Sequence, residues 1–453
     1  LGSRGLGDVY KRQLQNSPIA RGFTLTILGS GLSKLIIIIL TFYCTNRLTK
    51  SEFGEYSLLR NTLNMVLCVC ALNFSSLCTK FTVEIKTSLD SYYRLLILTA
   101  FSLSVCTLLG FFLILLPSNF LESVIGTSNL NSYVKIIGLL LPALMFQPLI
   151  EGILKGLMEF KTVGVLQIIS SLFFLVSTIV GIHLNGLNGA IVSMLLYYSF
   201  YTLISLYTIW KTKPDIQLHF EKSKFKENLP VLSSMIIPVF VMSFIEAPVL
   251  WISQLMLAHY SSTEAVSSMT IILQIKNFTI LIPSYFFSTF MAFAGKMSVK
   301  KEYPSYFNKF SRLIRLFAIY GVSVAIIISM MGNLILSLYG KSYVSDNTGL
   351  ILSNISIPLL VLIGLIKIDL IIQEHQKQLL YISIGWNIIW LILFFVALEY
   401  KAMPLHAFFG TQFIGILFQF LLFWTIYNND RNRLFPYTCL LYTSPSPRDP
   451  KTS

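Results

Sequence analysis

A few ionisable side chains lie within or beside stretches of the chain that are otherwise apolar. The bases are Lys34, Arg60, Lys276 and Lys367, and the acids are Glu246, Asp369 and, near the end of one stretch, Glu151. A charged group inside a lipid bilayer costs at least about 2.5 kcal/mol, so such groups are usually kept for a ligand or a transport pathway. Because the bases outnumber the deep acids, this pattern predicts a cationic interior.

A cationic interior suits an anionic cargo. Arg and Lys donate charge-assisted hydrogen bonds to phosphate oxygens, which makes a phosphate-bearing lipid the natural candidate. We expect a substrate-binding cavity, and the residues predicted to line it are Lys34, Arg60, Asn61, Lys276 and Asn277. The apolar tail of the lipid would stay in the bilayer while its polar head crosses through this cavity.

Some of these charges can be neutralised inside the protein. Lys367 and Asp369 are two residues apart, and Lys34 can extend to the membrane surface or pair with Glu246. Pairing of this kind cannot absorb all four bases. Glu246 and Asp369 are also the candidates for coupling transport to a proton or sodium gradient.

Motifs for other chemistries are missing from the sequence. The chain has no Walker-type glycine-rich lysine loop, and its histidines have no spaced partners that would suggest a metal site; they are His183, His219, His259, His375 and His406. We therefore expect no catalytic residue, no metal, no cofactor and no nucleic-acid partner.

The elements that position the charged residues are predicted to be membrane-spanning helices. Of the 453 residues, 55% are hydrophobic and only 12% are charged, about half the charged fraction of an ordinary soluble domain. Apolar runs of about 20 residues, each able to cross the bilayer as a helix, recur along the chain. The fold class expected is an all-α integral membrane protein with about 12 transmembrane helices, at 23–44, 56–74, 94–116, 133–152, 163–182, 190–210, 232–257, 267–293, 313–331, 349–372, 379–398 and 407–427.

Both ends of the chain have a foreign character. The segments Ser3–Gln13 and Cys439–Asp449 are similar to in-frame translations of a transposon-based sequencing adapter. We therefore assign residues 1–13 and 439–453 to adapter-derived, non-native sequence and leave them out of the fold prediction.

The distribution of Lys and Arg predicts the orientation in the membrane. If the N-terminus is cytoplasmic, most loop bases are on the inner side, and the outer loops hold only Arg47, Lys50, Lys135, Lys341 and Lys401. The positive-inside rule then places both termini in the cytoplasm. We expect a multi-pass protein of the bacterial cytoplasmic (inner) membrane.

The longest polar connection between the middle spans divides the chain into two predicted lobes of six helices each. Residues 14–212 form the N-terminal lobe, 213–230 a cytoplasmic linker, and 231–438 the C-terminal lobe. Arg60-Asn61 on the second span of the first lobe is matched by Lys276-Asn277 on the second span of the other. Two such lobes around a central site are typical of transporters built from repeats.

Four segments carry a resemblance to a known family. They are RLTKSEFGEYSLLRN (47–61), EGILKGLMEFKTVGVLQIISS (151–171), LNGLNGA (184–190) and ILSLYGKSY (335–343). In this order and spacing they resemble the polysaccharide flippases of the multidrug/oligosaccharidyl-lipid/polysaccharide exporter superfamily, which include O-antigen and capsule repeat-unit flippases of lipopolysaccharide and related polysaccharide biosynthesis.

The resemblance implies a V-shaped transporter that works by alternating access. It would transfer an undecaprenyl-diphosphate-linked oligosaccharide from the inner to the outer leaflet, with membrane lipids and the glycan polymerase machinery as further partners. Related lipid II flippases place basic cavity residues on the first, second and eighth spans, which here carry Lys34, Arg60 and Lys276. Two of these are Lys, which keeps the charge but not the bidentate fork of Arg.

Two other functions are weighed against this one. A multidrug cation exporter of the same superfamily would need an acidic cavity, which the excess of buried bases argues against. A membrane polysaccharide polymerase or ligase would carry a large outer loop, whereas the predicted outer loops are short.

Overall fold

The structure, a computed structural model, describes residues 18–68, 73–85, 89–115, 130–212, 222–231, 233, 236–299, 303–373 and 375–434. These residues form helices and their connections, with no β-strand among them. In hydrocarbon every backbone N–H and C=O must be bonded within the protein, which a helix achieves within one segment. The predicted all-α class is thereby confirmed.

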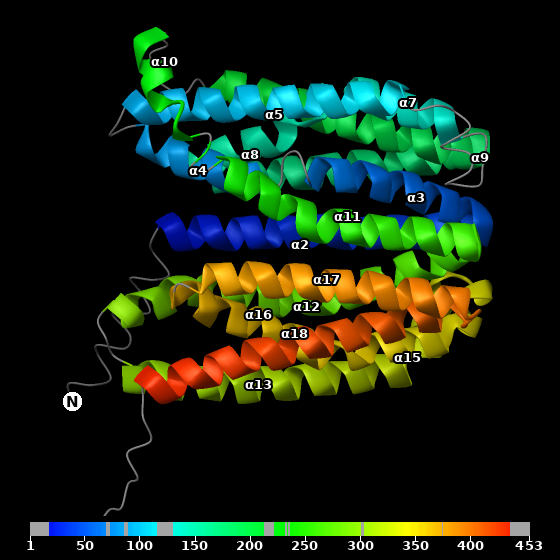
Figure 1. The fold of residues 1–453 in the computed structure, drawn as a ribbon. Helices are drawn as coiled ribbons and strands as arrows, with labels where there is room; N and C mark the ends of the chain where they lie inside the picture. Colours follow the sequence, from blue (N-terminus) through cyan, green and yellow to red (C-terminus); the bar gives the residue numbers. More distant parts are fainter. Residues whose placement is uncertain are drawn as a thin grey trace, which may run out of the picture.

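The helices of the first half gather on one side of the molecule (Figure 1). They are α2 (Pro18–Arg47), α3 (Lys50–Leu67), α4 (Asn73–Glu84), α5 (Leu89–Leu115), α7 (Leu130–Leu144), α8 (Phe146–Gly156) and α9 (Phe160–Thr212). A short helix, α10 (Lys222–Asn228), follows and lies against α5, where Asn228 bonds to Arg94 and Asp90. The second part of the predicted linker is therefore docked on the first half; 213–221 lies outside the described residues.

The helices of the second half form the other group (Figure 1). They are α11 (Ile237–Tyr260), α12 (Thr263–Val299), α13 (Tyr303–Met330), α14 (Gly332–Tyr339), the 3₁₀ turn η3 (Lys341–Asp346), α15 (Asn347–Ile355), α16 (Ile357–Ile372), α17 (Gln376–Glu399) and α18 (Pro404–Leu434). Helix α11 packs on both α3 and α17, so it joins the two groups.

As far as their residues are described, the twelve predicted spans fall on helices, with turns at Met145 and Ser356 that break two of the spans and a turn at Met331 that ends another. Nine segments of the described chain are long and apolar enough to cross a membrane. One of them, α9, holds two predicted spans, and large apolar side chains such as Leu108, Phe111 and Leu139 remain exposed on the helix surfaces. Such faces are expected where lipid surrounds the protein. Together with the nine long apolar segments of the described chain, they show that the chain is a multi-pass membrane protein.

Helix α9 turns back on itself within the segment LNGLNGA. The backbone leaves the helical region at Asn185 and at Gly186, whose φ is 54°. The two arms then pack closely: a Cβ on Gly189 would lie 1.8 Å from the carbonyl oxygen of Gly181. Only glycine permits this turn and this contact together.

Candidate substrate cavity between the two helix groups

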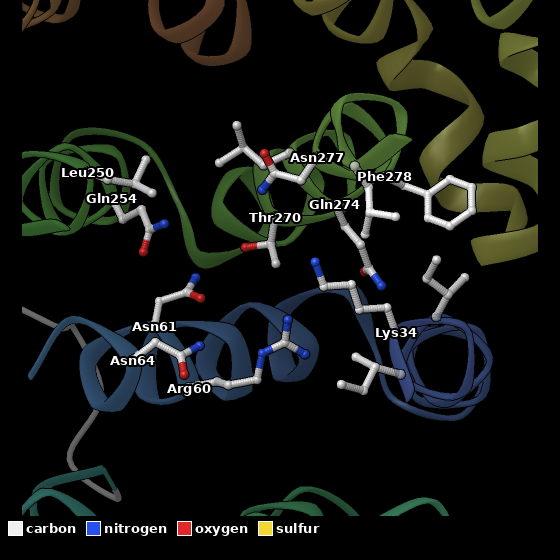
Figure 2. A pocket seen from close by; sticks show the side chains of 14 residues that line it. Lys34, Arg60, Asn61, Asn64, Leu250, Gln254, Thr270, Gln274, Asn277 and Phe278 are labelled. Atoms are coloured by element: carbon white, nitrogen blue, oxygen red, sulfur yellow. The ribbon is translucent and has the colours of Figure 1, made fainter. Parts of the chain in front are cut away.

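A cavity of about 480 Å³ lies between α2 and α3 on one side and α11 and α12 on the other (Figure 2). Its volume is within the range of small-molecule sites in proteins, roughly 300–1,000 Å³. The polar residues that line it are Lys34, Arg60, Asn61, Asn64, Gln254, Thr270, Gln274 and Asn277. We refer to it as the central cavity.

Four of the five predicted substrate-binding residues line the central cavity. Lys34 comes from α2, Arg60 and Asn61 come from α3, and Asn277 comes from α12. Figure 2 shows the Lys34 amine and the Arg60 side chain in the gap that faces α12. The structure thus brings together two bases that are 26 positions apart in the sequence.

Lys276 is directed away from the central cavity. The lining residues of α12 recur at intervals of three and four, from Thr270 to Leu281, and Lys276 falls on another face of this helix. Its ammonium donates a hydrogen bond to Gln412 Oε1 of α18 at 2.6 Å and lies 5.5 Å from the centre of the Phe409 ring. The side chain is buried within the second helix group, at 3% exposure. The sequence predicted that Lys276 and Asn277 both line the cavity. In the structure Asn277 lines it and Lys276 does not, because neighbouring residues on a helix face different sides.

The electrostatics of the central cavity are set by two bases and several amides. Among the described residues that line it, Lys34 and Arg60 are basic and none is acidic. Gln274 donates to Thr41 Oγ1 at 3.2 Å, and Asn64 accepts a hydrogen bond from the Tyr198 hydroxyl at 2.9 Å. The cavity therefore combines positive charge with fixed amide dipoles.

Three lining residues have buried polar atoms without a hydrogen-bond partner in the described structure. They are Gln254 Oε1, Thr270 Oγ1 and Gln274 Oε1. Such atoms are costly to bury without a ligand or water. The sequence prediction missed Asn64, Gln254 and Gln274, although Asn64 lies four residues after Arg60 and Gln274 three before Asn277, which is the spacing of one helix face.

One end of the central cavity is closed by contacts between the two helix groups. Lys50 forms an ion pair with Asp346 at 2.7 Å, Asn46 donates to the carbonyl oxygen of Leu338 at 2.9 Å, and Ser51 is hydrogen-bonded to Thr263 at 2.8 Å. We call this set of contacts the Lys50 seal. Lys50 also donates to the carbonyl oxygen of Ser342 at 3.3 Å, and this hydrogen bond joins two of the four landmark segments, RLTKSEFGEYSLLRN and ILSLYGKSY.

Further hydrogen bonds join the two groups at the level of the cavity lining. Trp251 Nε1 of α11 donates to Thr62 Oγ1 of α3 at 2.9 Å. Thr62 follows the lining residue Asn61, and Gln274, which donates to Thr41, itself lines the cavity, so both bonds cross the interface beside the cavity. Farther along α12, Phe278 of the cavity lining is 43% exposed.

Of the two acids predicted to couple transport, Asp369 does not line the central cavity, and the side chain of Glu246 is outside the described part of the structure. Asp369 of α16 is fully buried, and its Oδ1 accepts a hydrogen bond from Tyr306 at 2.5 Å. Its Oδ2 has no hydrogen-bond partner in the described structure. Lys367 projects from a different side of α16, as residues two apart on a helix do. Glu246 lies on α11, and its side chain is outside the described part.

Comparison with known proteins yields one matching family and many structures of the same fold. A family model described as "Polysaccharide biosynthesis protein" matches residues 19–294. This match confirms the resemblance carried by the landmark segments. A search of curated proteins found no match.

The solved structures that resemble this chain share its fold at low sequence identity. An inward-facing multidrug resistance MATE family transporter of the MOP superfamily has a TM-score of 0.74 and 12% identity, covering 91% of this chain and 99% of its own. An outward-facing one has a TM-score of 0.65 and 13% identity, with 93% and 98% covered. A MOP superfamily transporter from Pyrococcus furiosus has a TM-score of 0.60 and 13% identity, also with 93% and 98% covered.

Proposed function

The chain belongs to the polysaccharide biosynthesis protein family, and we propose that it transfers an undecaprenyl-diphosphate-linked oligosaccharide from the inner to the outer leaflet of the bacterial cytoplasmic membrane. The observation that carries the proposal is the convergence of Lys34 and Arg60 in one cavity without an acidic lining residue among those described. A diphosphate needs positive charge and hydrogen-bond donors, and the cavity offers both. The glycan head would occupy the cavity while the prenyl tail stays in lipid.

The charge of the central cavity distinguishes this function from export of cationic drugs. A cation would be repelled by Lys34 and Arg60, and the described lining has no carboxylate to attract it. Among proteins of this fold, the Pyrococcus furiosus transporter is described as having a binding pocket of reverse polarity that suggests a different function. Within one fold, the charge of the binding cavity therefore indicates the charge of the substrate better than the fold does.

Alternating access gives the cavity a route to both leaflets. The positive-inside rule assigns the Lys50 seal to the outer face, so the conformation described has its outer end closed. Opening this seal while the inner ends of the helices approach each other would release the head group on the other side. Rocking of one helix group against the other is the usual form of such a motion.

Asp369 is the candidate for coupling this motion to an ion gradient. A carboxylate that is fully buried and bonded through only one oxygen is costly to keep charged. Uptake of a proton or a sodium ion would relieve that cost and change the packing around Tyr306. Membrane lipids and the glycan polymerase machinery remain the expected partners.

Replacement of Arg60 tests the proposal. Arg60→Ala should lower export of the surface glycan at least about tenfold, since a hydrogen bond to a charged group contributes about 1.5–3 kcal/mol, and Arg60→Lys should retain part of the activity. Arg47→Ala is the matched control because Arg47 is exposed, beside the Lys50 seal and outside the cavity lining. All variants are compared at equal membrane abundance. Normal glycan export by Arg60→Ala would refute the cavity assignment.

A further inference from the structure

A second cavity, of about 310 Å³, opens beside the central cavity within the first helix group. It is lined by residues of α2, α8 and α9 only, and it shares Lys34 and Ile37 with the central cavity. A molecule held at Lys34 can therefore extend from one cavity into the other. We call the second cavity the side pocket.

The side pocket is lined by groups that bond to hydroxyls. Its polar side chains include Ser30, Ser33, Gln147, Glu151 and Gln167. Two aromatic rings, those of Tyr197 and Tyr201, complete the wall. Amides and carboxylates accept or donate hydrogen bonds to sugar hydroxyls, and a tyrosine offers an apolar ring face with a polar tip.

A hydrogen-bond network fixes these groups in place. Glu151 accepts hydrogen bonds from the Tyr201 hydroxyl and, at 3.4 Å, from Gln167 Nε2. Gln167 Oε1 in turn accepts from Ser30 at 2.7 Å, and Lys155 pairs with Glu151 at 3.4 Å. A binding site whose side chains are held in advance loses less entropy when a ligand arrives.

The same network argues for a neutral ligand over a cation. Glu151 is the only carboxylate of the described pocket lining, and its charge is already balanced by Lys155. A cation in the side pocket would therefore meet Lys34 and a carboxylate whose charge is already balanced. A sugar ring, with neutral hydroxyls and an apolar face, fits a lining of amides, hydroxyls and tyrosines.

We propose that the side pocket binds the sugar attached to the diphosphate, so that the first residue of the glycan is recognised next to the bases of the central cavity. The inference rests on the proposed function, because it presumes a lipid diphosphate at Lys34 and Arg60. Ser30 lies four residues before Lys34, about 6 Å along α2. The side pocket therefore extends about one helical turn from the base that it shares with the central cavity.

Gln147→Leu is the variant best suited to test the side pocket. The Gln147 amide lines the pocket, and the substitution keeps a similar side-chain volume. The matched control is Gln378→Leu, the same change at an exposed site on α17. Arg60→Ala serves as the reference for loss of diphosphate binding.

Binding to the purified full chain in nanodiscs separates the two subsites. The probes are undecaprenyl diphosphate without sugar and a panel of undecaprenyl-diphosphate monosaccharides carrying glucose, galactose, N-acetylglucosamine or N-acetylgalactosamine. We expect at least one sugar to raise the affinity of the unmodified protein. Gln147→Leu should reduce the affinity for that lipid about 3- to 10-fold, the effect of one neutral hydrogen bond, and leave the sugar-free lipid unchanged. Arg60→Ala should weaken both.

Each other outcome overturns a specific part of the inference. Equal affinity of the unmodified protein for all probes would refute the side pocket and leave the proposed function standing. Equal weakening of both lipid classes by Gln147→Leu would also refute it. Failure of the unmodified protein to bind any undecaprenyl diphosphate would instead refute the proposed function.

A labelling measurement guards against a misfolded Gln147 variant. Ser33→Cys places a thiol in the side pocket, and its maleimide labelling is measured above that of the natural cysteines. The sugar-bearing lipid should protect this thiol at least severalfold better than the sugar-free lipid. Equal protection by both would overturn the inference.

Discussion

Lys50 Nζ lies 2.7 Å from Asp346 Oδ2, and this ion pair joins the two helix groups at the closed end of the central cavity. The same ammonium donates to the carbonyl oxygen of Ser342 and lies 5.1 Å from the centre of the Tyr343 ring. Both charged side chains are only 16% exposed. Screening by salt is weaker for such partly buried pairs than for surface pairs. This ion pair therefore stabilises the closed conformation.

Removal of one partner should weaken the Lys50 seal. In Lys50→Met, Asp346 keeps a hydrogen bond from Ser268 but loses its counter-ion, so the closed end should open more often. Labelling of Thr270→Cys in the central cavity by a membrane-impermeant maleimide should then rise severalfold in intact cells. The charge-exchanged variant Lys50→Asp with Asp346→Lys should bring the labelling back toward that of the parent. Unchanged labelling in Lys50→Met would show that the ion pair does not hold this end closed.

A covalent bond across the same seal should stop transport. The hydroxyl oxygens of Ser51 and Thr263 are 2.8 Å apart, which places their Cβ atoms near the separation of a disulfide. The double variant Ser51→Cys with Thr263→Cys should cross-link under oxidation and lose glycan export, and a reductant should restore it. Each single cysteine variant serves as the control. Full export by the cross-linked protein would exclude opening of this seal as a transport step.

Some of this arrangement could be predicted from the sequence and some could not. Arg60 stands out because a charge in an apolar span is costly wherever its helix packs. Lys276 stands out for the same reason. Successive residues on a helix point about 100° apart, so Lys276 and its neighbour Asn277 cannot both face the cavity. Only the packing of α12 decides that Asn277 faces the cavity and Lys276 faces Gln412. The meeting of Lys50 with Asp346 joins positions 296 residues apart. No local pattern encodes such a distant contact.

Gly54 permits the close approach of α3 to α12 beside the seal. A Cβ at this position would lie 2.0 Å from the carbonyl oxygen of Thr263, so Gly54→Ala must push the two helices apart. We expect increased maleimide labelling of Thr270→Cys from outside the cell, as for the broken ion pair. Gly31→Ala is the control, because a Cβ on Gly31 meets no atom within 4 Å. Labelling that rises equally in both variants would contradict this explanation.

Asp369 and Glu246 are expected to matter for coupling rather than for substrate affinity. Asp369→Asn removes the charge while keeping an acceptor for the Tyr306 hydroxyl. Flipping in vesicles should then lose most of its dependence on a proton or sodium gradient, and Glu246→Gln tests the second acid. Glu264→Gln, an exposed acid at the start of α12, is the control. If flipping stays equally gradient-dependent in both amide variants, these acids are structural.

Lys276 is expected to contribute to stability and not to substrate binding. In Gln412→Leu its buried ammonium loses the acceptor at 2.6 Å, which should cost about 1.5–3 kcal/mol and lower the melting temperature of the purified protein. The double variant Lys276→Met with Gln412→Leu removes both polar groups and should recover much of the loss, because no unpaired charge is left buried. Affinity for undecaprenyl diphosphate should remain within about twofold of the parent in the double variant. A tenfold loss of affinity at unchanged melting temperature would instead place Lys276 among the substrate-binding residues, alongside Lys34 and Arg60.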